Sequence, residues 1–338
     1  MSFSTFSSNR YTVTVILMAA VLFGGFVAAS HVIVNHFVAP VDQRLKKLQL
    51  EEASSGKDAV FGDSRLNYGF ASSDDFVNLA FDGDSIADMV AKVDHFLSAG
   101  HPDRIVLQAS SNMFAGYRLA EPAEAFFQDY GHGVLSEYHR VRLFHYWRIV
   151  LSGAHFTPKG QLQPTGWKKV EDDWSMVRRD ARLKEARERI ELQTPVESFA
   201  REPDAREYEN LVKRLTAAGI TTCLVRPPVS REYLTFARQN PLWAEVDSFF
   251  AALARRHGAR YVNLGDAFAG EGQTALFADA DHLNAKGAPL ATRLIREKCF
   301  PDDTFQDVRL QGRAGGRGVR HGARVDRGRE HLDDHRHG

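Results

Sequence analysis

The alternation of short apolar runs with helical patterns is the feature that most narrows the fold of this chain. Five runs rich in Val, Ile or Leu are each short enough for one buried strand: 59–61, 77–79, 104–109, 221–225 and 260–264. Helical patterns lie between them, at 85–99, 205–218 and 244–257, and each ends next to a glycine. Because strands joined through helices pair in parallel, we expect a three-layer α/β sandwich with a mainly parallel five-stranded sheet. Ligand chemistry is then expected at the carboxyl ends of the strands.

An uncharged apolar segment lies ahead of the first predicted strand. Residues 13–29 contain no charged side chain and residues 30–40 continue mostly apolar, which is long enough to cross the hydrocarbon core of a bilayer. A cleaved signal peptide usually has a shorter apolar region and a more basic start, whereas only Arg10 precedes this run. We therefore predict an uncleaved transmembrane helix within residues 1–40. The small residues 27–29 leave signal cleavage as the alternative.

The charges that flank this segment do not decide its orientation. Arg10 on one side faces Arg44, Lys46 and Lys47 on the other, so the positive-inside count does not favour a cytoplasmic N-terminus. The first segment of a chain with a large following domain is commonly exported. We expect a single-pass protein of the cell membrane whose domain lies on the periplasmic side.

The remaining chain divides into a spacer, one domain and a tail. Residues 41–58 are polar and charged and are predicted to form a helical spacer, and residues 59–300 to form the α/β domain. Residues 117–199 interrupt the strand and helix rhythm, so we interpret them as an insertion that selects substrate or forms a plain helical cap. Residues 301–338 are predicted to be a disordered tail, because most of them are Arg, Gly, His and Asp with few apolar side chains to bury.

The charge balance and the cysteine count argue against two classes of protein. Lys plus Arg and Asp plus Glu each number 43, so no net field attracts nucleic acid, and no nucleic-acid partner is expected. Two cysteines are too few for a disulfide framework and lack the spacing of a metal site. Cys223 lies in an apolar run and is interpreted as a buried core thiol, with a bridge to Cys299 in an oxidising compartment as the alternative.

A serine follows the first predicted strand. The segment from Asp58 to Arg65 is typical of an apolar strand that delivers Gly62, Asp63 and Ser64 at its carboxyl end. Gly62 permits a tight turn, and a helix that begins after Ser64 would offer free backbone amides to negative charge near the hydroxyl. The same three residues also describe a turn followed by a helix cap, so this motif is weak alone.

A second polar motif lies near the other end of the domain. Asp279 and His282 are three residues apart, a spacing that lets the carboxylate reach the imidazole nitrogen that faces away from the serine. A serine hydroxyl needs such a base because it is a poor nucleophile at its own pKa. Asp281, the neighbour of His282, is expected to point to solvent or to act as a cap. Without Ser64, this acidic cluster would equally fit a cation, so a metal-dependent phosphoesterase is a further alternative.

Together the two motifs resemble the SGNH, or GDSL-type, hydrolase superfamily. Its blocks are a strand followed by Gly-Asp-Ser, a glycine, an asparagine and a terminal Asp-x-x-His, and they occur here in the same order from about Ala59 to Glu297, apart from the insertion. The resemblance implies a flavodoxin-like fold. It also implies that Ser64 is the nucleophile, Asp279 the orienting acid and His282 the general base.

The resemblance further implies an oxyanion hole. The family builds it from the backbone amide of the nucleophile, here Ser64, a glycine after the second strand and an asparagine after the third. Gly83 fits the glycine position. Asn112 is the counterpart of the asparagine, although the usual Gly-x-Asn-Asp pattern lacks both its glycine and its aspartate here. A simple turn residue at Gly83 and a helix cap at Asn112 are the plain alternatives.

Three further side chains are candidates for substrate contact. Arg226 follows the fourth predicted strand, at the ligand-binding edge of the sheet, and is predicted to bind an anionic sugar, with a surface turn as the alternative. Trp147 and Trp167 lie in the insertion, where they either stack on sugar rings or pack within the insertion.

The predicted reaction is acyl transfer through an acyl-serine, with water as acceptor in an esterase and a sugar hydroxyl in an O-acyltransferase. The anchor, the insertion and the forms Gly-Asp-Ser-Arg and Asp-His-Leu-Asn resemble envelope proteins that modify exopolysaccharide, such as alginate O-acetyltransferase-type proteins. This resemblance implies a polysaccharide or another acylated envelope substrate, and a membrane acyl-donor protein as partner. No cofactor and no metal is expected. A noncatalytic envelope protein that binds polysaccharide or serves as a scaffold is the alternative.

Overall fold

The computed structural model of the chain describes residues 6–38, 43–54, 56–72, 75–119, 137–152 and 160–301. The tail predicted at 301–338 lies outside this part except for its first residue.

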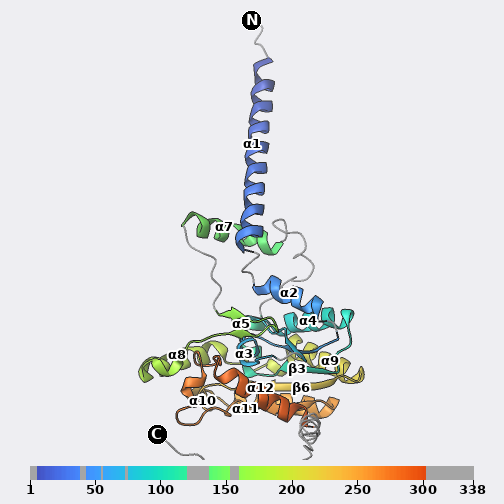
Figure 1. Cartoon of the computed structure of the whole chain (residues 1–338), viewed down its shortest axis with the longest axis vertical. Coiled ribbons are helices and arrows are strands. Elements are labelled where there is room, and N and C mark those ends of the chain that lie inside the picture. The colour runs from blue at the N-terminus through green and yellow to red at the C-terminus, as the bar shows by residue number, and fades with distance from the viewer. Residues whose placement is uncertain are drawn as a thin grey trace, which may run out of the picture. The chain divides into compact units, whose positions relative to one another are not determined.

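Five parallel strands form the centre of the domain, as the sequence predicted (Figure 1). They pair in the order β2-β1-β3-β6-β7, so the direction in which the sheet grows reverses between β1 and β3. Ligands of such sheets bind beyond the carboxyl ends of the strands at this reversal. The strand bounds agree with the predicted runs to within one residue: β1 (Asp58–Phe61), β2 (Phe76–Asn78), β3 (Arg104–Gln108), β6 (Thr221–Arg226) and β7 (Arg260–Asn263). The predicted three-layer α/β fold is therefore confirmed.

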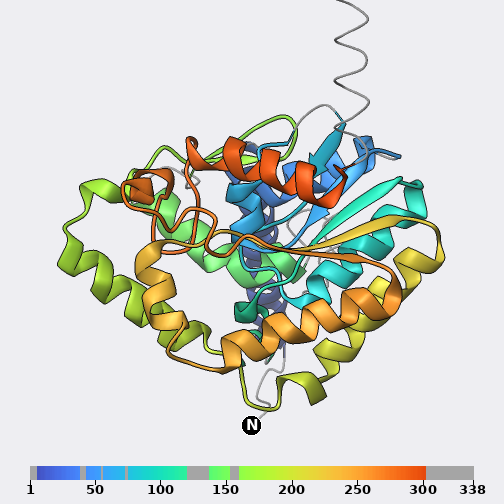
Figure 2. The ribbon, with the colours of Figure 1, turned by 90° about the horizontal axis from the view of Figure 1, so that it is seen from below.

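Helices cover both faces of this sheet (Figure 2). Three lie on one face: α4 (Ile86–Ala99), α9 (Pro203–Ala217) and α11 (Leu242–His257). Two lie on the other: α3 (Ser64–Gly69) and α12 (Gly287–Cys299). Ile105 and Leu107 of β3 join the core under α4, α9 and α11, and Val106 between them points to the opposite face and is fully buried as well. Burial on both faces explains why the strands are continuous apolar runs.

Local signals fix the start of α4. Ser85 accepts a hydrogen bond from the backbone N–H of Asp88, and the Asp88 carboxylate accepts one from the backbone N–H of Ser85, which makes a capping box. Such a cap contributes about 1 kcal/mol. The side chains that enter the core then recur every three or four residues: Ile86, Met89, Val93 and Phe96.

The segment predicted as an insertion contributes helices and a small hairpin. Its described elements are α7 (Glu137–Leu151), the antiparallel pair β4 (Gln161–Leu162) and β5 (Lys168–Lys169), η4 (Trp174–Met176) and α8 (Arg179–Gln193). Helix α8 packs against α10 (Arg231–Ala237), the helix that follows β6. The insertion therefore reaches the carboxyl edge of the main sheet. The other short elements are η2 (Ser111–Phe114), α5 (Gly116–Leu119), η5 (Phe199–Arg201) and η6 (Gln273–Leu276).

A long apolar helix precedes the domain. Helix α1 (Phe6–Val32) continues as a short π-helical segment, η1 (Ile33–Val38). The span Tyr11–Val38 has a mean hydropathy of 2.3, and none of its most apolar stretch is buried within the structure. It is long and apolar enough to cross a membrane, a property that transmembrane anchors and signal sequences share.

The predicted spacer forms α2 (Gln43–Ala53), which is tied to the domain through a buried lysine. The Lys47 ammonium donates to Asn67 Oδ1 (2.9 Å) and to the carbonyls of Asn78 (2.8 Å) and Ala80. Burial, together with the nearby Lys92 ammonium, lowers the pKa of Lys47 well below its ordinary value. Lys47 thus links α2 to the segments that follow β1 and β2.

A disulfide joins the last helix to the sheet. Cys223 in β6 and Cys299 at the end of α12 are bridged, with 5.7 Å between their Cα atoms. The bridge, and not a free core thiol at Cys223, is what the structure contains. A disulfide and an apolar N-terminal helix together indicate an extracytoplasmic protein, because thiols in the cytosol are kept reduced.

Candidate active site

Ser64 lies where β1 ends and α3 begins, beside the reversal in the sheet. A Cβ added to Gly62 would lie 2.6 Å from Cβ of Gln108, so only glycine lets the chain pass this close to β3. Asp63 then caps α3, and its Oδ1 accepts a hydrogen bond from the backbone N–H of Arg65 (2.9 Å). Among the described residues no acceptor is found for the backbone N–H of Ser64. This amide is therefore available to a negative charge near the hydroxyl.

The structure brings Ser64, His282 and Asp279 into one line of hydrogen bonds. His282 Nε2 lies 2.7 Å from Ser64 Oγ, and His282 Nδ1 lies 2.8 Å and 2.9 Å from the two carboxylate oxygens of Asp279. With the proton on Nδ1 shared with Asp279, Nε2 is the acceptor for the serine hydroxyl. This arrangement can activate the serine as a nucleophile.

The loop that carries the base is shaped by Asp279 itself. Asp279 Oδ1 accepts hydrogen bonds from the backbone N–H groups of Asp281 (3.1 Å) and His282 (3.0 Å), besides the contact with the imidazole. The three-residue spacing seen in the sequence is therefore that of a carboxylate which closes its own turn. The ring of Tyr68 packs edge-on against His282, with 4.8 Å between the ring centres.

The electrostatic surroundings favour the charged form of His282. Burial alone would lower the pKa of this imidazole, but the charges of Asp279 and Asp281 outweigh burial and raise its pKa above the ordinary value. Burial raises the pKa of the Asp279 carboxyl, but the charge and hydrogen bond of His282, together with Arg189, more than offset burial, so the net pKa is lowered. An imidazolium that forms during reaction is therefore stabilised at this position.

Asp281 does not point to solvent and does not act as a cap, in contrast to the prediction. It is 1% exposed, and its Oδ2 accepts hydrogen bonds from Arg65 Nε (3.1 Å), Arg65 Nη2 (3.0 Å) and Gln193 Nε2 (2.9 Å). Asp281 therefore faces the protein interior, and its other oxygen, Oδ1, lies 3.5 Å from His282 Nδ1. Burial raises the pKa of Asp281, and His282, Arg65 and Arg189 more than offset it, so the net pKa is lowered.

The insertion supplies part of this buried cluster. Gln193, the last residue of α8, accepts hydrogen bonds from Arg65 Nη2 (2.8 Å) and from the hydroxyl of Tyr233 in α10 (2.6 Å). Arg189, one turn earlier, lies 3.8 Å from Asp279 Oδ2 and 3.7 Å from Asp281 Oδ1. The sequence analysis did not identify these residues. Only Arg65 carried a signal, its position directly after the serine.

The acidic cluster of Asp279, Asp281 and His282 has the residue types of a cation site. Ligand atoms of Asp279, Asp281 and His282 lie within 4.8 Å of one another, as a site of that kind needs. Oδ1 of Asp279 already accepts from two backbone amides and the imidazole, and Oδ2 of Asp281 accepts from Arg65 and Gln193. Two guanidinium groups next to the cluster also repel a cation. The contacts favour the hydrogen-bonded line over metal binding.

Gly83 follows β2 in a conformation that favours glycine. Its φ is +89°, and no acceptor is found for its N–H within the described part of the chain. Arg118 in α5 donates to the carbonyls of Gly83 and Asp84 (3.1 Å to the latter), and so holds the two peptide units that follow this position. The predicted role of Gly83 as an oxyanion donor stays a prediction.

Asn112 belongs to a closed ring of hydrogen bonds. The Asp63 N–H donates to Gln108 Oε1 (2.9 Å), Gln108 Nε2 to Ser110 Oγ (2.8 Å), Ser110 Oγ to Asn112 Oδ1 (2.6 Å) and Asn112 Nδ2 to Asp63 Oδ2 (2.7 Å). We call these four residues the Asp63 ring. It fixes Asn112 beside the residue that precedes the nucleophile, and one hydrogen of the amide remains for another acceptor. The signal that was missed is Gln108, a polar residue at the end of an apolar strand.

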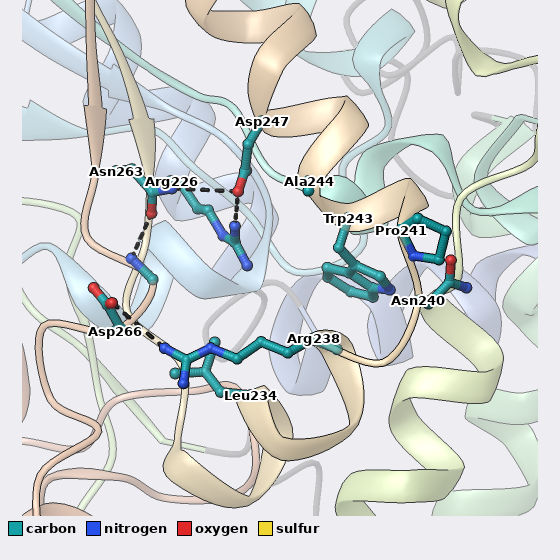
Figure 3. A pocket seen from close by; sticks show the side chains of 12 residues that line it. Arg226, Leu234, Arg238, Asn240, Pro241, Trp243, Ala244, Asp247, Asn263 and Asp266 are labelled. Carbon is teal, nitrogen blue, oxygen red and sulfur yellow. Dashed lines mark hydrogen bonds and ion pairs between the residues drawn. The ribbon is translucent and has the colours of Figure 1, made fainter.

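Arg226 ends β6 and lines a pocket of about 290 Å³ (Figure 3). Its guanidinium pairs with Asp247 of α11, and Tyr261 donates to the other oxygen of that carboxylate (3.0 Å). Trp243 forms another part of the wall, whereas Ser64 and His282 do not line this pocket. Arg226 therefore lies in a pocket that Ser64 and His282 do not line, and substrate binding by Arg226 stays a prediction.

The two tryptophans of the insertion make contacts within the protein. Trp167 donates from Nε1 to the carbonyl of Tyr68 (2.9 Å). Trp147 stacks on Phe26 of α1, with 5.8 Å between ring centres, and donates to Ser30 Oγ (3.0 Å). Both tryptophans therefore pack, but these contacts are with residues outside the insertion and not within it, and stacking on sugars stays a prediction.

No family model matches the chain, and no curated protein is significantly similar to it. Among solved structures, the chain is similar to a candidate platelet activating factor from Streptococcus pneumonia, at 12% identity and a TM-score of 0.42, over 84% of this chain and 99% of that one. It is also similar to a GDSL-like lipase from Bacteroides thetaiotaomicron, at 10% identity and a TM-score of 0.37, over 76% and 98%. A third similar structure is the psychrotrophic esterase EstA from Pseudoalteromonas, at 12% identity and a TM-score of 0.34, over 72% and 96%.

Proposed function

We propose that this protein is a membrane-anchored serine enzyme that transfers acyl groups, as an esterase or an O-acetyltransferase of cell-envelope or exopolysaccharide substrates. The observation that carries the proposal is the hydrogen-bonded line from Ser64 through His282 to Asp279. This order of contacts, at the carboxyl edge of a parallel sheet, is the one that a serine nucleophile with a histidine base and an orienting carboxylate requires.

The line performs acyl transfer in two halves. His282 Nε2 takes the proton of Ser64 Oγ as the oxygen bonds to the ester carbonyl carbon, and the imidazolium then gives that proton to the leaving alkoxide. The backbone amides of Ser64 and Gly83, with Asn112 as third donor, hold the oxyanion in between. Water or a sugar hydroxyl then attacks the acyl-serine with His282 again as base. Water completes hydrolysis, and the sugar hydroxyl completes transfer.

Contacts of α7 support an anchor that is retained. Trp147 of α7 contacts Phe26 and Ser30, which lie on either side of the small residues 27–29 where a signal peptidase would cut. Tyr146 of α7 is buried against η1, which follows that position. Cleavage would break this packing, so we infer a retained single-pass anchor. The disulfide between Cys223 and Cys299 supports a domain on the periplasmic side.

The substrate is proposed from motif forms and location. The Gly-Asp-Ser-Arg and Asp-His-Leu-Asn forms favour an acylated polysaccharide, and a domain outside the cytoplasm has access to such a polymer. Transfer there needs an acyl donor that reaches the outer face of the membrane, so a membrane acyl-donor protein is the proposed partner.

The test is turnover of p-nitrophenyl acetate by the detergent-solubilised full chain, wild type against Ser64→Ala, with and without an acidic polysaccharide. We expect release of nitrophenol that depends on Ser64, and acetylation of the polymer if transfer is the reaction. Release without acetylation would identify an esterase. Equal rates for both proteins would refute the serine mechanism and favour a noncatalytic polysaccharide-binding or scaffold protein.

A further inference from the structure

Arg65 and Asp281 form an ion pair that joins the two halves of the catalytic line. Arg65 is the residue after the nucleophile and Asp281 the residue before the base, and two nitrogens of the guanidinium reach the same carboxylate oxygen at 3.1 Å and 3.0 Å. Their side chains are 2% and 1% exposed. Because 216 residues separate the partners in sequence, this pair is a direct connection between the α3 end of the site and the loop that carries His282.

The other contacts of the pair make its geometry rigid. Arg65 Nη2 also donates to Gln193 Oε1 (2.8 Å) and to the hydroxyl of Tyr233 (2.7 Å), and its guanidinium lies 5.2 Å from the centre of the Tyr233 ring. Gln193 binds Asp281 as well, so it contacts both members of the pair. Buried hydrogen bonds to charged groups are stronger than neutral ones, so this cluster holds both catalytic segments in place.

Asp281 also acts on the imidazole through space. Its Oδ1 has no hydrogen-bond partner within the described residues and lies 3.5 Å from His282 Nδ1. Asp279 takes the hydrogen bond of that nitrogen, so the second carboxylate contributes charge without competing for the proton. The charged and titratable groups around His282 are Asp279, Asp281, Arg65, Arg189, Tyr68 and, further out, Glu185.

We propose that Arg65 and Asp281 are positioning residues for acyl transfer: their ion pair sets the approach of Ser64 to His282, and the Asp281 carboxylate adds to Asp279 in stabilising the imidazolium. The proposal rests on the proposed function for its kinetic consequences. The electrostatic half of the proposal, stabilisation of the His282 imidazolium by Asp281, can be tested on the pKa of His282 without any substrate. Helix α8 of the insertion completes the cluster through Gln193 and Arg189.

The first test is Asp281→Asn in the full chain. The imidazolium loses one of its two carboxylates, so the pKa of His282 falls and the free base persists to lower pH. We expect the acidic limb of kcat/KM for p-nitrophenyl acetate to move to lower pH, and kcat to fall about 10- to 100-fold with KM nearly unchanged. An acidic limb that stays in place overturns the electrostatic half of the proposal.

A measurement without substrate separates this proposal from the proposed function. The imidazole Cε1–H resonance of His282, assigned by its loss in His282→Asn, is titrated in the wild type and in Asp281→Asn. A titration midpoint that moves to lower pH supports the role of Asp281 even if the wild type hydrolyses no ester. An unchanged midpoint overturns that role even if the enzyme is active.

A double variant distinguishes positioning from plain stability. Asp281→Leu leaves the Arg65 charge buried without a partner, so its Tm falls, whereas Arg65→Met/Asp281→Leu removes both charges and regains most of the lost Tm. We expect kcat to stay low and the acidic limb to stay displaced in this double variant, although its Tm is restored. Recovery of kcat together with Tm would show that the pair serves folding only. Asp180→Asn, which breaks the exposed 2.9 Å pair with Arg178, is the control, and it should change neither Tm nor kcat.

Discussion

Two buried carboxylates flank the hydrogen bond between Ser64 and His282, and their closest partners differ. Asp281, beside His282, accepts two hydrogen bonds from the Arg65 guanidinium, at 3.1 Å and 3.0 Å. Asp63, beside Ser64, accepts its short hydrogen bonds from neutral groups, the Asn112 amide and the Arg65 backbone N–H, and its ion pair with Arg118 is longer, at 3.5 Å. The closer positive charge thus lies next to the imidazole, and neutral hydrogen bonds dominate next to Ser64. We call these the charged side and the neutral side of the site.

The largest expected effect comes from removing the imidazole of His282, the proposed base of Ser64. His282→Ala should lower kcat/KM for p-nitrophenyl acetate by at least about 10³-fold, because Ser64 then lacks a base. Added imidazole should restore part of the rate in His282→Ala and none in Ser64→Ala. Rescue of Ser64→Ala by imidazole, or a wild-type rate in His282→Ala without imidazole, would contradict the role of His282 as the base of Ser64.

The disulfide between Cys223 and Cys299 allows a change that touches neither the contacts of Asp63 nor those of Asp281. Cys223→Ser/Cys299→Ser should lower the free energy of unfolding by about 4 kcal/mol, because the bridge closes a long loop, with 76 residues of sequence separation. Urea unfolding of the wild type with and without dithiothreitol should reproduce this difference. At temperatures where the variant is folded, its pH profile should match the wild type. A displaced profile would mean that the bridge acts on the site.

Opening the Asp63 ring should affect rate without affecting charge. Asn112→Ala removes the donor to Asp63 Oδ2 and a candidate oxyanion donor, and should lower kcat about 10- to 100-fold. The acidic limb of the pH profile should stay where it is, in contrast to Asp281→Asn. A limb that moves in Asn112→Ala would remove the distinction between the charged side and the neutral side.

A backbone substitution sharpens the neutral side further. Gly83→Ala places a Cβ in open space but forces alanine to a φ of +89°, which costs about 1–2 kcal/mol. Gly56→Ala is the matched control, since its φ is +81° and it also has open space around the added Cβ. Both variants should lose similar stability in thermal unfolding, and only Gly83→Ala should lose turnover. Equal activity of the two variants would contradict the prediction that turnover depends on the backbone conformation at Gly83.

The smallest effect is read from the wild type alone. Because the pKa of His282 is raised by Asp279 and Asp281 against the effect of burial, the active neutral imidazole appears only at higher pH than for an ordinary histidine near 6.5. The acidic limb of kcat/KM should therefore lie above that value, with activity increasing as pH rises through it. An acidic limb below 6.5 would mean that the effect of burial on the pKa of His282 outweighs the charges of Asp279 and Asp281.

The sequence was sufficient for the sheet and for Ser64, Asp279 and His282, because local patterns determine them. Apolar runs located the strands to within one residue, and the spacing between Asp279 and His282 is a turn closed by its own carboxylate. The Arg65–Asp281 pair was missed because its partners are 216 residues apart and no local pattern relates them. Asp281 was misassigned for a related reason: nothing near it in the sequence indicates the distant Arg65 and Gln193 that bind its carboxylate.

The catalytic contact itself spans 218 residues of sequence, from Ser64 near the start of the domain to His282 near its end. During synthesis and export the serine emerges long before its base, so a partly made chain carries the hydroxyl without anything to activate it. Competence for acyl transfer is thus delayed until the final helix has docked. The contact between Ser64 and His282 thus reports that the domain is complete, because a fragment that ends before His282 lacks the imidazole.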